Sequence, residues 1–123
     1  MSKFNFVDLF CGAGGLSCGL EMSEMTCVLG TDQDKAAIDT FQKNHPDAKT
    51  FVDDISKLTK AKLKKATGGK KIHLVCGGPP CQGMSTAGLG IPDDSRNFLF
   101  LEFVRIVQEL KPDYIILENV TGM

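Results

Sequence analysis

The stretch Asp8-Leu9-Phe10-Cys11-Gly12-Ala13-Gly14-Gly15 decides how this chain folds. It closes an apolar, strand-like segment at residues 5–10 and leads into a helical segment that begins near Leu16. Glycines at such a junction let a ligand approach the backbone, and the first turn of the helix offers unpaired N–H groups to a carboxylate or phosphate. The stretch therefore predicts a ligand-binding turn at the end of a strand.

Two other interpretations of this turn stay open. Gly12-x-Gly14 resembles the start of the dinucleotide-binding pattern G-x-G-x-x-G, but the sixth position holds Ser17, where glycine or alanine is wanted. The turn could also bind no ligand. Asp32, at the end of the next strand-like segment, is placed to accept hydrogen bonds from a ribose diol, and this favours a nucleoside-containing ligand.

Strand-like and helical segments alternate along the rest of the chain. Further strands are predicted at residues 26–31, 49–52, 72–76 and 114–117, and helices at 34–44, 56–66 and 95–110, with a glycine- and proline-rich loop at 77–92. This alternation is typical of an α/β fold with a mostly parallel sheet, and right-handed crossovers favour the strand order 3-2-1-4-5. In that order the loops that follow strands 1, 2, 4 and 5 share one edge of the sheet.

Apolar spacing also predicts which helix residues are buried. In helix 34–44 these are Ala37, Ile38 and Phe41. In helix 95–110 the expected apolar face is wide and consists of Phe98, Leu101, Phe103 or Val104, Ile106 and Leu110. The N-terminal caps of this helix are expected at residues 93–95.

The composition fits one globular domain over residues 1–123, with 42% hydrophobic and 24% charged residues. A net charge of −1 argues against a self-sufficient nucleic-acid binder, and the lysines between residues 57 and 71 are interpreted as a solvated helix face. Five cysteines without C-x-x-C spacing indicate neither a disulfide framework nor a metal site. Without a signal-like N-terminus or 18 consecutive apolar residues, we expect a cytoplasmic protein with no membrane partner.

Two further motifs place reactive side chains at the same edge of the sheet. In Pro79-Pro80-Cys81-Gln82, the prolines fix the backbone so that the Cys81 sulfur is held at the rim, whereas Cys27 and Cys76 are expected in the core. In Glu118-Asn119-Val120, the carboxylate directly follows an apolar strand and is expected beside the neighbouring loop, near Cys81. A plain surface glutamate is the alternative for Glu118.

The glycine-turn stretch, Pro79-Pro80-Cys81-Gln82 and Glu118-Asn119-Val120 resemble, in order and spacing, three motifs of the cytosine-C5 DNA methyltransferases. The segments 93–97 and 103–112 also resemble the bacterial modification enzymes of restriction-modification systems. The resemblance covers essentially the whole chain. It implies a Rossmann-like class I S-adenosylmethionine-dependent methyltransferase fold, incomplete at its C-terminal side, with the target-recognition domain absent from this chain.

The resemblance also implies a reaction on double-stranded DNA. Cys81 would add as thiolate to C6 of a flipped cytosine, and Glu118 would hydrogen-bond the base while C5 takes the methyl group. S-adenosylmethionine would be the cofactor and S-adenosylhomocysteine its product, with no metal. Ser85 and Arg96 would contact DNA phosphates. The resemblance implies cofactor-binding roles for twelve residues: Phe10, Cys11, Gly12, Ala13, Gly15, Asp32, Gln33, Asp54, Ile55, Gly78, Pro80 and Leu99. Gln33 stands where relatives often carry an aromatic residue.

Full-length members of the family continue past the Glu-Asn-Val motif. We therefore expect this chain to be a fragment or a split subunit, inactive alone, whose partner is a second chain with the missing target-recognition and C-terminal portions. Two alternatives remain. One is the related tRNA cytosine methyltransferase, which shares the cysteine motif, and the other is a cofactor-binding module without turnover.

Overall fold

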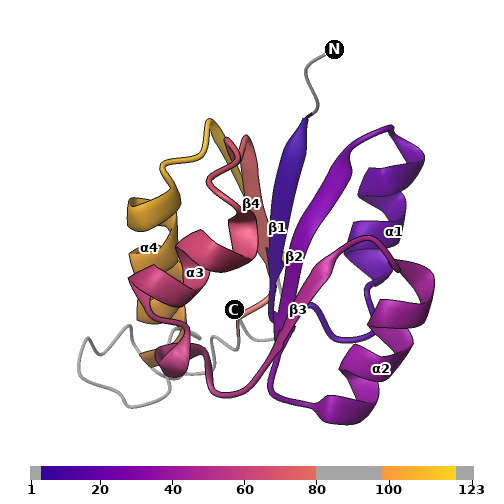
Figure 1. Cartoon of the computed structure of the whole chain (residues 1–123), viewed down its shortest axis with the longest axis horizontal. Coiled ribbons are helices and arrows are strands. Elements are labelled where there is room, and N and C mark those ends of the chain that lie inside the picture. Colours follow the sequence, from indigo (N-terminus) through magenta and orange to yellow (C-terminus); the bar gives the residue numbers. More distant parts are fainter. Residues whose placement is uncertain (1–3, 80–97, 119–123) are drawn as a thin grey trace, which may run out of the picture.

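A computed structural model of the chain describes residues 4–79 and 98–118. In chain order the elements are β1 (Asn5–Leu9), α1 (Gly15–Met22), β2 (Thr26–Asp32), α2 (Lys35–Asn44), β3 (Lys49–Val52), the 3₁₀ turn η1 (Ile55–Lys57), α3 (Lys60–Thr67), β4 (Leu74–Gly77), α4 (Phe98–Leu110) and β5 (Tyr114–Leu117). The five strands pair in parallel in the order β3-β2-β1-β4-β5. The predicted α/β class and strand order are confirmed (Figure 1).

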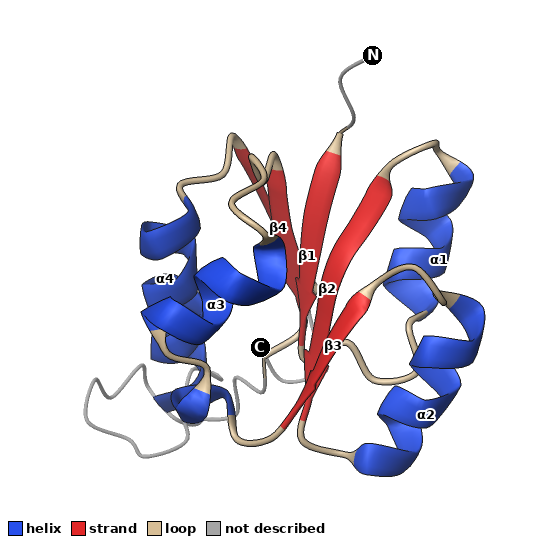
Figure 2. Ribbon diagram, viewed as in Figure 1, coloured by secondary structure: helices blue, strands red, loops and turns tan. Residues whose placement is uncertain are grey.

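Helices cover both faces of the sheet, with α1 and α2 on one side and α3 and α4 on the other (Figure 2). Alternation along β1 explains the two cores, because successive side chains of a strand point to opposite faces. Phe6 packs in a cluster with Phe41 of α2, whereas Val7 and Leu9 join a cluster with Ile106 of α4. The sheet is therefore the middle of three layers.

Two of the three expected core residues of α2 and the two expected core cysteines are buried, whereas Ala37 is only partly buried. Ile38 is 3% exposed, Phe41 0%, Cys27 3% and Cys76 0%. Gly30 of β2 makes room for the Phe41 ring, because a Cβ at this position would lie 2.4 Å from the ring. The aromatic ring of α2 thus packs directly on the backbone of the sheet.

The predicted helix at 56–66 is wrong at its start. Its first residues belong to η1, where the Asp54 carboxylate accepts a hydrogen bond from the Ser56 N–H, and α3 starts only after Thr59, whose hydroxyl accepts from the Lys62 N–H. Two short polar side chains that can cap a helix start thus divide the segment into two pieces. The fourth strand, predicted at 72–76, lies at Leu74–Gly77, and Ile72 before it is buried.

The predicted apolar face of α4 is also partly wrong. Phe103 and Ile106 are buried, but Phe98 and Leu101 are 46% and 57% exposed. Leu110 packs against the core as predicted, and Leu99 and Val107 pack there in place of Phe98 and Leu101, so the buried stripe follows the helical spacing from residue 99, not 98. The expected caps at 93–95 lie outside the described residues.

Within residues 4–79 and 98–118, no helix is both long enough and apolar enough to cross a membrane.

Candidate functional site

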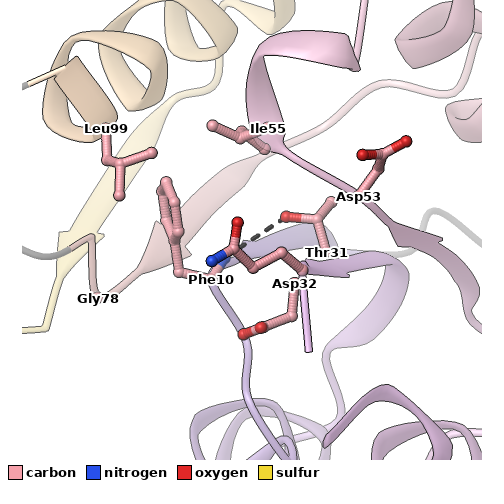
Figure 3. A pocket seen from close by; sticks show the side chains of 8 residues that line it. Phe10, Thr31, Asp32, Asp53, Ile55, Gly78 and Leu99 are labelled. Atoms are coloured by element: carbon pink, nitrogen blue, oxygen red, sulfur yellow. Dashed lines mark hydrogen bonds between the residues drawn. The ribbon is translucent and has the colours of Figure 1, made fainter. Parts of the chain in front are cut away.

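A hollow of about 220 Å³ opens at the edge where the parallel strands end. Side chains from the ends of β1, β2 and β3 meet there with the residue after β4 and the start of α4 (Figure 3). The lining residues are Phe10, Thr31, Asp32, Gln33, Asp53, Ile55, Gly78 and Leu99. One wall is thus apolar and the other carries carboxylates and an amide.

Phe10 turns the chain at the end of β1. Its φ of 57° lies in the left-handed region, which residues with a side chain rarely adopt. Thr31 of β2 supports this conformation, because its hydroxyl accepts from the Phe10 N–H at 3.4 Å and its carbonyl accepts from the Cys11 N–H at 2.8 Å. The Phe10 ring then extends toward Leu99 and Ile55, as Figure 3 shows.

Asp32 connects the glycine turn to the start of α2. One carboxylate oxygen accepts from the Gly12 N–H at 2.8 Å and the other from the Asp34 N–H at 2.9 Å. Each carboxylate oxygen can accept a second bond, so the group retains acceptor capacity toward the hollow. Asp32 therefore orders the turn and also lines the hollow.

The glycine turn leaves the start of α1 open. Gly14 caps this helix with a φ of 95°, and, having no side chain, it offers no acceptor to the N–H groups of the first turn. A Cβ on Gly14 would also lie 2.7 Å from the Phe41 ring, so only glycine fits without displacement. Unpaired N–H groups and the helix dipole make this end suited to a negatively charged group.

Asp54 does not line the hollow itself, but it holds the turn that places Ile55 there. The Ser56 N–H and hydroxyl donate to its carboxylate at 2.9 and 2.8 Å, and these hydrogen bonds lower the pKa of Asp54. The ionised carboxylate fixes the 3₁₀ turn, and Ile55 is 5% exposed at its first position.

Glu118 lies beside the loop that leads to Cys81, as predicted. Its N–H donates to the Gly77 carbonyl at 2.8 Å, which extends the pairing of β4 with β5 by one residue. A Cβ on Gly78 would lie 3.1 Å from Glu118 Oε2, so the carboxylate rests directly against this glycine. Gly77 is equally constrained, because a Cβ there would lie 2.0 Å from the Leu9 carbonyl oxygen.

Three of the described cysteines are held as thiols. Burial raises the pKa of Cys27 to about 12 and raises the pKa of Cys11 and Cys76 further, and the neighbouring Asp8 carboxylate adds to the effect at each. Because the thiolate is the nucleophile, these three side chains are poorly suited to covalent chemistry.

The structure brings together half of the residues predicted for the cofactor. Phe10, Asp32, Gln33, Ile55, Gly78 and Leu99 line the hollow. Cys11, Gly12, Ala13 and Gly15 form the adjoining turn, and Asp54 lies one residue before the lining residue Ile55. Pro80, Cys81, Ser85 and Arg96 lie outside the described residues.

The sequence did not point to Thr31 and Asp53, which also line the hollow. The pairing of Asp32 with Val52 in the β2–β3 register places Asp53 at this edge. A sequence signal existed for both, since each is a polar residue at the end of an apolar strand and each adjoins a residue that was singled out.

Comparison with known proteins agrees with this arrangement. The family model described as C-5 cytosine-specific DNA methylase matches residues 4–123. The chain belongs to this family. Its relatives in the methylase family include the Type II methyltransferases M.XorII of Xanthomonas oryzae pv. oryzae, 42% identical, and M.AgeI of Thalassovita gelatinovora, 38% identical. Each match covers 95% of this chain and 28% of the relative.

A solved structure has the same fold as this chain. A prophage-encoded protein of E. coli, described as a DNA modification methyltransferase, superimposes with a TM-score of 0.83 at 37% identity, over 98% of this chain and 33% of that protein. The Rossmann-like fold expected for a methylase is therefore confirmed. This chain spans about a third of the length of these methylases.

Proposed function

We propose that residues 1–123 form one domain that binds S-adenosylmethionine and carries the catalytic residues of a DNA cytosine-C5 methyltransferase. The observation that carries the proposal is the position of Glu118. Its carboxylate rests against Gly78, three residues before Cys81, at the same sheet edge as the hollow and the glycine turn. Family membership makes cytosine C5 the expected target.

The residues of the hollow fit a nucleoside. The ring of Phe10 with Ile55 and Leu99 offers an apolar surface for a base, and Asp32 and Asp53 offer acceptors for hydroxyl groups. The open start of α1 fits the carboxylate of the methionine portion. Pockets for whole ligands usually measure about 300–1,000 Å³, so a hollow of about 220 Å³ takes the nucleoside part and the turn takes the rest. When bound, S-adenosylmethionine supplies an electrophilic methyl group.

On the DNA side, we assign the covalent step to Cys81. Its thiolate would form a bond to C6 of the flipped cytosine, and the electron pair that this addition places on C5 would take the methyl group as the bond between that group and the cofactor sulfur breaks, which would release S-adenosylhomocysteine. Glu118 hydrogen-bonds the base and stabilises the charge that develops on it. Loss of the C5 proton to a base then returns the electron pair to the ring, and the Cys81 sulfur leaves. Ser85 and Arg96 are proposed phosphate contacts.

Titration calorimetry with S-adenosylhomocysteine tests the cofactor half of the proposal. We expect binding by the chain itself, and at least tenfold weaker binding by Phe10→Ala, because the ring supplies most of the apolar wall. Lys62→Ala, which alters the lysine-rich exposed face of α3, serves as the matched control and should bind unchanged. Absence of binding by the wild type would count against the proposal.

We further propose that methyl transfer needs target-recognition and C-terminal portions beyond residues 1–123, carried by a longer form of this chain or by a second polypeptide. The support is β5, whose residues Tyr114–Leu117 are 63%, 50%, 40% and 40% exposed although all four are apolar or aromatic. Strands of parallel sheets are normally covered on both faces. A polypeptide that adds to β5 and covers its faces would remove this exposure.

Expression in a host that lacks cytosine methylation tests the catalytic half. The chain alone should leave host DNA unmodified. Together with the reading frame that follows it in its genome, it should produce 5-methylcytosine, detected by mass spectrometry of digested DNA, and Cys81→Ser should abolish the product. Methylation confined to tRNA would assign the chain to the tRNA enzymes instead, and product formation with Cys81→Ser would overturn the covalent step.

A further inference from the structure

Half of the basic residues of this chain lie in one short segment. Residues 57–71 contain seven of its 14 basic residues and no acidic residue, so the segment carries +7 in a chain whose net charge is −1. The segment follows η1 and α3, and α3 lies across the face of the sheet that it shares with α4 (Figure 1). All seven side chains are exposed, and together they are called the lysine surface: Lys57, Lys60, Lys62, Lys64, Lys65, Lys70 and Lys71.

Five of these seven lysines form no ion pair with the described residues. The two lysines at the ends of the surface pair with Asp53 at 3.6 Å and with Asp113 at 3.4 Å. Glu109 lies in a hollow beside α3 that Lys60 also lines, but its carboxylate pairs with Arg105 at 3.3 Å. Within residues 4–79 and 98–118, the positive charge of the surface is therefore not neutralised by the fold.

The stability of α3 does not account for this arrangement. Lys64 and Lys65 suit the last turn, but Lys60 and Lys62 lie in the first turn, where the helix dipole disfavours positive charge and no acidic residue offsets it. Lys60 and Lys64 are also four residues apart, a spacing at which like charges repel each other on a helix. A negatively charged partner would relieve both effects.

We propose that the lysine surface binds the phosphate backbone of duplex DNA without regard to base sequence. The choice of DNA rests on the proposed function, and charge density supports it. α3 has eight residues and is about 12 Å long, and duplex DNA presents about seven phosphate charges over that length. An extended acidic peptide presents at most about four. Contacts from lysine to phosphate hold a duplex in place but carry no sequence information.

The surface begins beside the hollow at the strand ends. Lys57 is the last residue of η1, whose first residue Ile55 lines the hollow, and it pairs with Asp53 of the same lining. At the other end of α3, Glu21 and Asp47 bring negative charge into the adjoining groove, so the surface stops there. DNA held along α3 therefore approaches the edge of the sheet at which the strands end.

Fluorescence anisotropy with a labelled duplex of A·T base pairs tests the surface apart from the catalytic site, because this duplex contains no cytosine. If five lysines each contact one phosphate, the affinity of the full chain should fall about 500-fold between about 50 and 200 mM salt, a log–log slope of about −4.5. Lys64→Gln/Lys65→Gln should reduce the slope by about 2 and weaken binding at least about tenfold at the lower salt concentration.

Lys35→Gln/Lys43→Gln is the matched control. Both lysines lie on α2, on the opposite face of the sheet, and the two double variants change the net charge equally (Figure 2). The control should keep the wild-type slope. Because all four side chains are exposed, both variants should also keep the wild-type melting temperature.

Equal slopes for the two double variants would leave the lysines as the solvated face expected from the sequence and would overturn the proposal. So would a wild type that does not bind the duplex at the lower salt concentration. Polyglutamate with the same number of charges that binds as tightly as the duplex overturns the assignment to DNA. Binding of S-adenosylhomocysteine should be unchanged in Lys64→Gln/Lys65→Gln. A wild type that does not bind S-adenosylhomocysteine but shows the slope difference counts against the proposed function and supports the lysine surface.

Discussion

Replacement of Asp8 by asparagine should change how the stability of the domain depends on pH. Burial raises the pKa of Asp8 from its ordinary value of 3.8 to about 6, against the opposing hydrogen bond from Ser17. Because the folded state binds this proton more tightly, the contribution of Asp8 to stability is present below pH 3.8 and is lost as the pH rises through about 6. At 1.36 kcal/mol per pH unit, the difference corresponds to about 3 kcal/mol.

Urea unfolding of the wild type and Asp8→Asn, followed by circular dichroism from pH 3.5 to pH 7.5, measures this effect. The other carboxylates cancel in the difference between the two proteins. The free energy of unfolding of the variant should gain about 3 kcal/mol on that of the wild type over this range, most of it above pH 4. Ser17 can still donate to the asparagine oxygen, so the variant keeps this buried contact.

Ser17→Ala provides the second arm. It removes the hydroxyl that lowers the pKa of Asp8, so the loss of stability should continue to higher pH than in the wild type. It should also cost about 1.5–3 kcal/mol near pH 7.5, the usual contribution of a hydrogen bond to a charged group. A difference between wild type and Asp8→Asn that stays constant across the range would refute the reasoning.

Three further predictions follow from the packing at the strand ends and beneath the hollow. Gly78→Ala places a Cβ 3.1 Å from Glu118 Oε2, and the displaced carboxylate should reduce 5-methylcytosine formation about tenfold in the co-expression assay. Gly77→Ala places a Cβ 2.0 Å from the backbone oxygen of Leu9, so we expect no soluble folded protein, and a wild-type melting temperature would contradict this. Arg105→Gln removes donors that bond the Leu58 and Ile55 carbonyls at 3.0 and 3.1 Å, and urea unfolding should show a loss of about 1–3 kcal/mol.

The strands and their order could be predicted because each strand is a short apolar run between breakers, and few topologies satisfy the right-handed crossover rule. The split of the predicted helix at 56–66 was harder to foresee. Asp54 and Thr59 both act as caps. From the sequence alone, such short polar side chains can either begin a new helix or lie within a longer one. Likewise the exposure of Phe98 and Leu101 depends on which stripe of α4 meets the sheet, and a helix with a wide apolar face leaves this undecided.

The candidate site was predictable where a motif adjoins a strand end, as for Phe10, Asp32 and Glu118. Asp53 also follows a strand end, but its place at the hollow depends on the register between β2 and β3. The contacts of His45 were also hidden, because its position before Pro46 already explains the end of α2. Its contacts with Glu21 and Gly14 join residues 24 and 31 positions apart in the chain, so only the folded arrangement reveals them.

At position 10, the left-handed backbone favours glycine, whereas the lining of the hollow uses an aromatic side chain. Glycine would adopt a φ of 57° at no steric cost, so drift toward a more stable fold should favour loss of the side chain. Under the proposed function, the Phe10 ring is retained because it contacts the nucleoside as well as the core cluster against which it packs. Among sequences of this type, glycine at position 10 would therefore mark chains that have kept the architecture but given up the nucleoside.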